Sequence, residues 1–196
     1  MGFSREYFRG FRDCIDLVDV DGIDSALDVI YQAMRNGRTI YLAGDGGSAA
    51  NASHAVCDLE KGITDIYPDA PIRAVSLSDN IATLTAYGND DSFDVVYSRP
   101  LERHGEADDV LVLLSVSGSS PNLTEAARTA RKKGMKLVGF LGKDGGKLRG
   151  VVDHPVVVPT QNYGFAETLH QLLCHMIKDY YLEARPMEDE KSDIPG

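Results

Sequence analysis

This sequence has few of the features that mark a secreted or membrane-spanning chain. It holds only three cysteines, Cys14, Cys57 and Cys174, and they lie far apart. An odd number of widely spaced thiols argues against a disulfide framework and indicates reduced cysteines in a cytoplasmic protein. The longest apolar runs are about six residues, far below the roughly 20 that a membrane-spanning helix needs. The segment Met1 to Arg12 is charged and aromatic and lacks the apolar core of a signal peptide.

Basic residues are scarce as well. The chain has 20 Lys and Arg against 30 Asp and Glu, a formal net charge of −10. Nucleic acids and anionic membranes both require clustered Lys and Arg, so neither is an expected partner. Part of the acidity lies at the C-terminus, where residues 183–196 include five acidic and two basic side chains. We expect this segment to be a loose acidic tail after a single domain with N-terminal helices that spans residues 1–182.

Five short runs rich in β-branched residues and leucine predict strands. They are nearly continuous rather than alternating, which is typical of parallel strands buried on both faces. The runs are Thr39–Ala43, Ile72–Leu77, Asp109–Leu114, Lys136–Leu141 and His154–Val158. Helical patterns cover Ser4–Asp19, Ile23–Arg35, Ser48–Glu60, Asp79–Tyr87, Ser92–Arg103, Pro121–Lys133 and Phe165–Leu182. This alternation predicts an α/β fold, a three-layer αβα sandwich around a five-stranded parallel sheet, with the ligand site at the carboxyl ends of the strands.

Two loops at those strand ends carry unusual composition. The first, GDGGSAAN from Gly44 to Asn51, is glycine-rich, but a plain tight turn explains it equally well. The second, SVSGSSPN from Ser115 to Asn122, places four serines around one glycine before a proline-initiated helix. Helix capping needs only one hydroxyl. Four hydroxyls and a helix N-terminus suit a phosphate monoester better, without any Lys or Arg.

Two helices carry candidate metal ligands. His54 and Asp58 are four residues apart and share a helix face, so they can hold one ion, although a surface pair is the commoner origin of this spacing. The last predicted helix carries Glu167, His170, Gln171 and His175. Spacing alone does not choose among them, because Glu167 and His175 lie about 12 Å apart along a straight helix. Histidine on an apolar helix is also often a packing residue.

Together, GDGGSAANASH, GND at Gly88–Asp90, SVSGSSPN and the late ExxHxxxxH resemble the sugar isomerase (SIS) domain family, and within it the phosphoheptose isomerases. The similarity extends from the N-terminal helices to about Leu182. It implies a flavodoxin-like SIS fold and a cytoplasmic enzyme that converts sedoheptulose 7-phosphate to D-glycero-D-manno-heptose 7-phosphate through an enediol. It also implies one Zn²⁺ per subunit and a homotetramer with sites at the subunit interfaces.

The resemblance also assigns roles to residues. Asp58 and His175 become the proton-transfer pair, and the metal ligands become His54, Asp58, Glu167 and His175. The substrate-binding residues become Asp45, Gly46, Gly47, Asn89, Asp90, Ser115, Val116, Ser117, Ser120 and Glu167.

Four of these positions depart from the family pattern. Asp45 replaces Asn, Val116 replaces Thr, Asp58 replaces Glu and Glu167 replaces Gln. The charge at Asp45 leaves open an isomerase of a different sugar phosphate. Carboxylates gathered at one site would repel a phosphosugar, and a dication would offset them.

Other functions on the same domain stay open. One is a non-catalytic SIS regulator that binds a protein partner such as the replication initiator DnaA and lacks the late histidine. Another is a sugar-phosphate lyase or sensor without the metal set. The presence of His175 beside the other candidate ligands favours the isomerase.

Overall fold

Five parallel strands form one sheet in the computed structural model, which describes residues 2–192 and the side chains of residues 2–185. The strand order is β2-β1-β3-β4-β5. The bounds are β1 Ile40–Gly44, β2 Ala74–Ser76, β3 Val110–Ser115, β4 Lys136–Gly142 and β5 His154–Val158. Every neighbouring pair is parallel, and β3 is buried along its whole length. The predicted five-stranded parallel sheet is confirmed.

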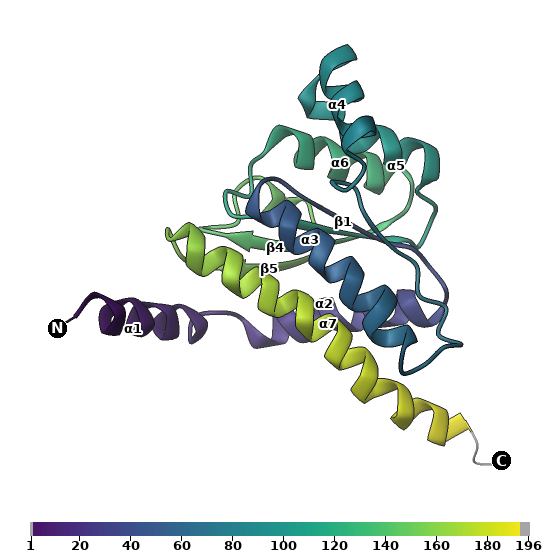
Figure 1. Ribbon diagram of the computed structural model, residues 1–196, viewed down its shortest axis with the longest axis horizontal. Helices are drawn as coiled ribbons and strands as arrows, with labels where there is room; N and C mark the ends of the chain where they lie inside the picture. The colour runs from purple at the N-terminus through teal and green to yellow at the C-terminus, as the bar shows by residue number, and fades with distance from the viewer. Residues whose placement is uncertain (1, 193–196) are drawn as a thin grey trace.

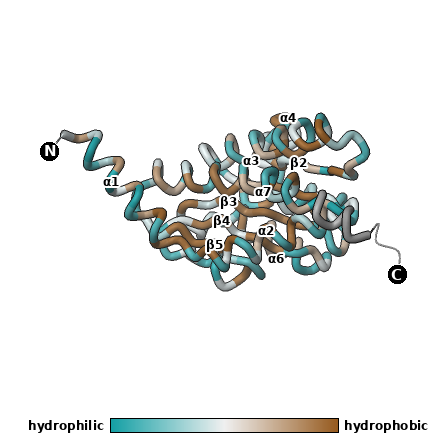
Figure 2. Tube along the Cα trace, turned by 90° about the horizontal axis from the view of Figure 1, so that it is seen from below, coloured by the Kyte–Doolittle hydropathy of each residue, from teal (hydrophilic) through white to brown (hydrophobic). Residues whose placement is uncertain are grey.

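Helices cover both faces of this sheet (Figure 1). On one face α2 (Val20–Arg35), α3 (Gly47–Cys57) and α7 (Tyr163–Ser192) enclose one apolar cluster. On the other face α5 (Ser98–His104) and α6 (Pro121–Lys132) enclose a second cluster. Figure 2 shows the hydrophobic strands in the middle of the molecule. The three-layer αβα sandwich is therefore confirmed, with one core on each side of the sheet.

The strand order decides where a ligand site forms. From β1 the chain moves outward to β2, and it then returns to place β3 on the opposite side of β1. This reversal opens a crevice beyond the carboxyl ends of β1 and β3. Gly44 at the end of β1 pairs with Leu114 near the end of β3. The loops that follow these two strands, which begin at Asp45 and Val116, therefore lie side by side.

Several helices differ from their predicted bounds. The helix predicted over Ser48–Glu60 ends as an α-helix at Cys57 and continues as a π-helical turn, η1 (Asp58–Ile63). The helix predicted over Ser92–Arg103 divides into a short 3₁₀ turn, η2 (Phe93–Val95), and α5. The second-strand region is followed by α4 (Ile81–Asp90), and the 3₁₀ turn η3 (Leu148–Gly150) precedes β5. α1 (Phe3–Ile15) extends away from the sandwich (Figure 1).

The last helix is longer than predicted, because it passes Leu182 and ends at Ser192. Arg185 anchors this extension. It is 8% exposed, its guanidinium lies 4.3 Å from the centre of the Tyr67 ring, and it donates to Asp69 at 2.8 Å. The ion pair and the ring contact hold the helix to the loop before β2 past the expected end. Residues 193–196 of the predicted acidic tail lie outside the described part of the chain.

The cysteine side chains agree with the prediction of reduced thiols. All three cysteines are free, with Cys14 and Cys174 buried and Cys57 exposed.

Among the described residues, none of the helices combines the length and the apolar character needed to cross a membrane.

Candidate functional site

The loop after β3 forms a small pocket lined with hydroxyls, which we call the serine pocket. Its volume is about 120 Å³, and Ser115, Val116, Ser117 and Ser120 line it. Ser115 Oγ accepts the N–H of Gly118 at 3.0 Å, so its own O–H remains to donate. Ser120 is the N-cap residue of α6 but makes no side-chain cap within the described structure. Hydroxyl donors and a helix N-terminus therefore meet in one pocket, which suits an anion.

Asp45 borders the serine pocket and is held there by two buried polar side chains, of which Tyr97 also donates to the carbonyl of Gly44 at 2.7 Å. Asn122 Nδ2 donates to Asp45 Oδ1 at 2.8 Å, and the hydroxyl of Tyr97 lies 3.0 Å from the same oxygen. Asn122 and Tyr97 are 2% and 1% exposed. Burial raises the pKa of Tyr97, so its hydroxyl keeps its proton at neutral pH. Because both side chains approach Oδ1, the other carboxylate oxygen is available to a ligand.

Glu167 faces the N-terminus of α3 from the first turns of α7. A Cβ at Gly47 would lie 2.6 Å from the Glu167 carboxyl carbon, so only glycine permits this approach. The backbone carbonyl of Glu167 accepts Asn51 Nδ2 at 2.8 Å. A carboxylate is favoured at the positive end of a helix dipole. Glu167 also lines both the serine pocket and a neighbouring cavity of about 500 Å³ that contains Gln171 and His175.

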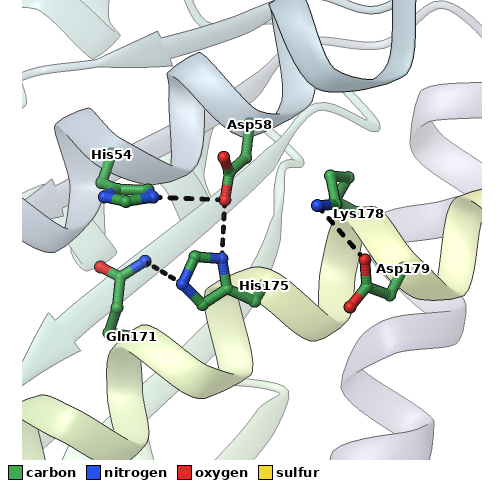
Figure 3. Close-up of polar contacts among 6 residues, drawn as sticks. All are labelled: His54, Asp58, Gln171, His175, Lys178 and Asp179. Atoms are coloured by element: carbon green, nitrogen blue, oxygen red, sulfur yellow. Dashed lines mark hydrogen bonds and ion pairs between the residues drawn. The ribbon is translucent and has the colours of Figure 1, made fainter. Parts of the chain in front are cut away.

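His54, Asp58 and His175 come together across the contact between α3 and α7 (Figure 3). His175 Nδ1 lies 2.8 Å from Asp58 Oδ2, and His54 Nε2 lies 3.5 Å from the same oxygen. The two imidazole rings meet edge to face, with centroids 5.0 Å apart. Gln171 Nε2 lies 3.3 Å from His175 Nε2. The imidazole of His175 is therefore held between Asp58 at one ring nitrogen and Gln171 at the other.

This group fits a metal ion in donor type and in spacing. One ligand atom from each of His54, Asp58 and His175 lies within 4.8 Å of the others. Two imidazole nitrogens and a carboxylate oxygen form a typical zinc donor set with an open position. Glu167, the fourth predicted ligand, does not join this group. It lies two turns before His175 on α7, and its side chain meets the N-terminus of α3 at Gly47.

Asn89 and Asp90 lie apart from the serine pocket. Both are exposed at the end of α4, where Asn89 Nδ2 donates to Asp90 Oδ1 at 2.8 Å. Asp90 lines a separate cavity with Arg99 and Arg103. Within one chain the structure does not bring these two predicted substrate contacts to the other site residues.

Three site residues were not chosen from the sequence. Gln171 could have been selected, because it lies four residues before His175 on one helix face. Tyr97 and Asn122 contact Asp45 from distant segments, and no spacing pattern in the sequence indicates either contact.

His170 is not part of the site surface. It is fully buried, and burial lowers its pKa to about 4. The unfolded chain, with an ordinary histidine pKa near 6.5, binds more protons than the folded chain between these values. We expect the free energy of unfolding to fall by about 3 kcal/mol between pH 7 and pH 4 through this residue.

Urea unfolding of the wild type and of His170→Leu across this pH range measures that contribution. The variant should lose this part of the pH dependence, whereas His104→Ala, at an exposed histidine, should keep it. An identical pH dependence in His170→Leu and wild type would contradict the assignment.

Comparison with known proteins agrees with this geometry. Residues 6–142 match the family model of the SIS domain. A phosphoheptose isomerase of Rhodospirillum rubrum is 38% identical over 181 residues, which cover 89% of this chain and 95% of that protein. The structure of phosphoheptose isomerase from Neisseria gonorrhoeae has a TM-score of 0.81 at 31% identity and covers 91% of this chain and 94% of its own. The one from Francisella tularensis has a TM-score of 0.83 at 25% identity, with 90% and 95% covered. The chain therefore belongs to the SIS domain family and, within it, to the phosphoheptose isomerases.

Proposed function

We propose that this chain interconverts sedoheptulose 7-phosphate and D-glycero-D-manno-heptose 7-phosphate. The observation that carries the proposal is the position of Glu167, which lines both the serine pocket and the cavity of His175. A phosphate in the serine pocket would therefore direct the rest of an extended sugar phosphate toward the imidazole and carboxylate groups on α3 and α7.

The serine pocket holds the phosphate. Hydroxyls of Ser115, Ser117 and Ser120 and the N-terminus of α6 donate to its oxygens. This binding energy orients the distant reacting carbons, which is how a group that does not react contributes to the rate.

Asp58 and His175 move the proton. One of them removes a proton from C1 of the ketose while O2 is protonated, which gives the enediol. A proton is then returned to C2 while O1 loses its proton, which leaves the aldehyde at C1. A carboxylate and an imidazole suit both steps, because a neutral imidazole accepts a proton and its protonated form returns it near neutral pH. The contact between Asp58 and His175 Nδ1 orients the ring and leaves Nε2 toward the cavity.

We assign one Zn²⁺ per subunit to His54, Asp58 and His175. When bound, the ion would polarise the carbonyl and hydroxyl oxygens of the reacting end and offset the negative charge of the carboxylates. Because a lone pair that binds zinc cannot also accept a proton, Asp58 and His175 need one free atom each during turnover. Glu167 binds substrate in this proposal, beside the N-terminus of α3.

The charge at position 45 bears on substrate choice. An amide there would satisfy Tyr97 and Asn122 with its oxygen and turn an N–H₂ donor to the pocket. Asp45 turns an acceptor to the pocket instead, so the facing substrate group must be a hydroxyl and not the phosphate. A heptose phosphate meets this requirement, and so would another polyhydroxy sugar phosphate, which is the second candidate substrate.

We assign the chain to a cytoplasmic homotetramer with sites at the subunit interfaces. One observation supports an assembly. Phe3 and Phe8 on α1 are 79% and 67% exposed, which leaves a large apolar surface in contact with water in an isolated chain. In such an assembly a neighbouring subunit could bring Asn89 and Asp90 to the site.

A coupled assay with sedoheptulose 7-phosphate tests the proposal on purified protein, with zinc measured per subunit. We expect turnover with about one zinc per subunit, a loss of at least tenfold in rate on chelation, and recovery when zinc is added back. Absence of turnover on any ketose phosphate by the zinc-loaded protein would exclude an isomerase. Protein without stoichiometric zinc would instead favour the regulator that binds a protein partner.

A further inference from the structure

The loop after β4 is interlocked with the loop that forms the serine pocket. A Cβ at Gly142 would lie 2.6 Å from the carbonyl oxygen of Val116, and one at Gly118 would overlap the carbonyl of Gly145. The N–H of Lys147 also donates to Ser119 Oγ at 3.2 Å. The backbone of the loop after β4 is therefore held in a fixed position relative to the serine pocket.

Lys143, the first residue after β4, has a backbone conformation that is unfavourable for lysine. Its φ is +53°, in the left-handed region, where glycine carries no penalty and a lysine does. Its N–H donates to the carbonyl of Thr160 at 3.3 Å, which ties the β4 loop to the segment before α7. Glycine occupies the other strained positions of this loop, Gly145 and Gly146. A lysine at such a position points to a use for its side chain.

The Lys143 side chain contacts a residue that lines the serine pocket. Its ammonium lies 5.3 Å from the centre of the Tyr163 ring, and Tyr163 lines the pocket together with Ser117 and Ser120. Tyr163 is 54% exposed, so the ring and the ammonium on it lie at the protein surface beside the pocket. The carboxylates of Asp45 and Glu167 also line the pocket and oppose the approach of an anion.

We propose that Lys143 is a phosphate-binding residue, whose ammonium moves from the face of Tyr163 to the phosphate held in the serine pocket. The inference rests on the proposed function only in taking a phosphate as the ligand of that pocket. The flexible four-carbon stem allows the ammonium to move, and an ammonium is a strong point-charge donor to phosphate. Resting on the ring, it keeps a cation beside the pocket at little cost.

Binding of inorganic phosphate, measured by calorimetry, tests the proposal without requiring turnover. We expect the dissociation constant to rise about tenfold in Lys143→Ala and in Lys143→Gly, with partial recovery in Lys143→Arg. Lys143→Gly separates charge from backbone strain, because it should unfold at a higher denaturant concentration than Lys143→Ala while binding phosphate equally weakly. Lys147→Ala removes an exposed lysine of the same loop and should bind like the wild type.

Unchanged phosphate affinity in Lys143→Ala and Lys143→Gly would overturn the proposal, and so would an equal loss in Lys147→Ala. In the coupled assay, Lys143→Ala should raise KM about tenfold and leave kcat within about twofold, since the proton-transfer pair is untouched. If the wild type turns over no ketose phosphate but its phosphate affinity still depends on Lys143, the proposed function fails and the role of Lys143 stands.

Discussion

Replacement of His175 by alanine is expected to lower kcat/KM for sedoheptulose 7-phosphate by about a thousandfold, the usual contribution of a positioned acid or base. His175 contacts both Asp58, at 2.8 Å, and Gln171, at 3.3 Å, and lines the cavity beyond Glu167. Its removal takes away a proton carrier and a metal ligand together. The coupled assay measures the loss, and the zinc content of the variant is measured in parallel.

Two further variants examine the roles of His175 as proton carrier and as metal ligand: Asp58→Asn should lose both, whereas Gln171→Leu should keep the metal. Asp58→Asn keeps the side-chain shape but loses the charge, so we expect loss of zinc and of activity. Gln171→Leu removes only the contact to Nε2 and should retain zinc, with a smaller fall in kcat. His104→Ala is the control, because His104 is exposed and lines neither the serine pocket nor the cavity of His175. Activity of His175→Ala within tenfold of wild type would exclude His175 as the acid or base.

Gly118→Ala is expected to lower the free energy of unfolding by about 3 kcal/mol and to abolish phosphate binding in the serine pocket. Gly118 has φ +60°, and an added Cβ would overlap the backbone of Gly145. Backbone strain and steric overlap each cost about 1 to 3 kcal/mol, and the backbone of Gly145 cannot rotate away as a side chain would. When the backbone moves to relieve this overlap, the loop after β4 separates from Ser117 and Ser119.

Denaturant unfolding and phosphate calorimetry on the same variant check both parts. Gly150→Ala is the matched control, because a Cβ there meets nothing within 4 Å and its φ is not positive. A Gly118→Ala protein that unfolds like Gly150→Ala and binds phosphate normally would show that the two loops do not need this close contact.

The sheet could be predicted from the sequence because its three central strands are buried on both faces. That burial leaves uninterrupted runs such as Asp109–Leu114 and Lys136–Leu141, and the observed strands match or overlap them. Helix ends were less accurate. The π-helical turn at Asp58 and the extension of α7 past Leu182 depend on contacts with distant segments, which local patterns do not contain.

The serine pocket was predictable for the same local reason. Its hydroxyls lie within six residues of the chain, so composition alone placed Ser115, Ser117 and Ser120 together at one strand end. Lys143 was missed because its relevance depends on a left-handed backbone and on the ring of Tyr163, twenty residues later.

The sequence by itself determined the strands, the serine-rich loop and the family to which the chain belongs, because each is encoded in contiguous residues. Only the tertiary structure decided which of the four candidate ligands meet. His175 reaches Asp58 across 117 positions of sequence, whereas Glu167, on the same helix, is directed to Gly47 and the serine pocket. The rise of an α-helix separates Glu167 and His175 by about 12 Å, so the packing of α7 against α3 divides them between two parts of one site.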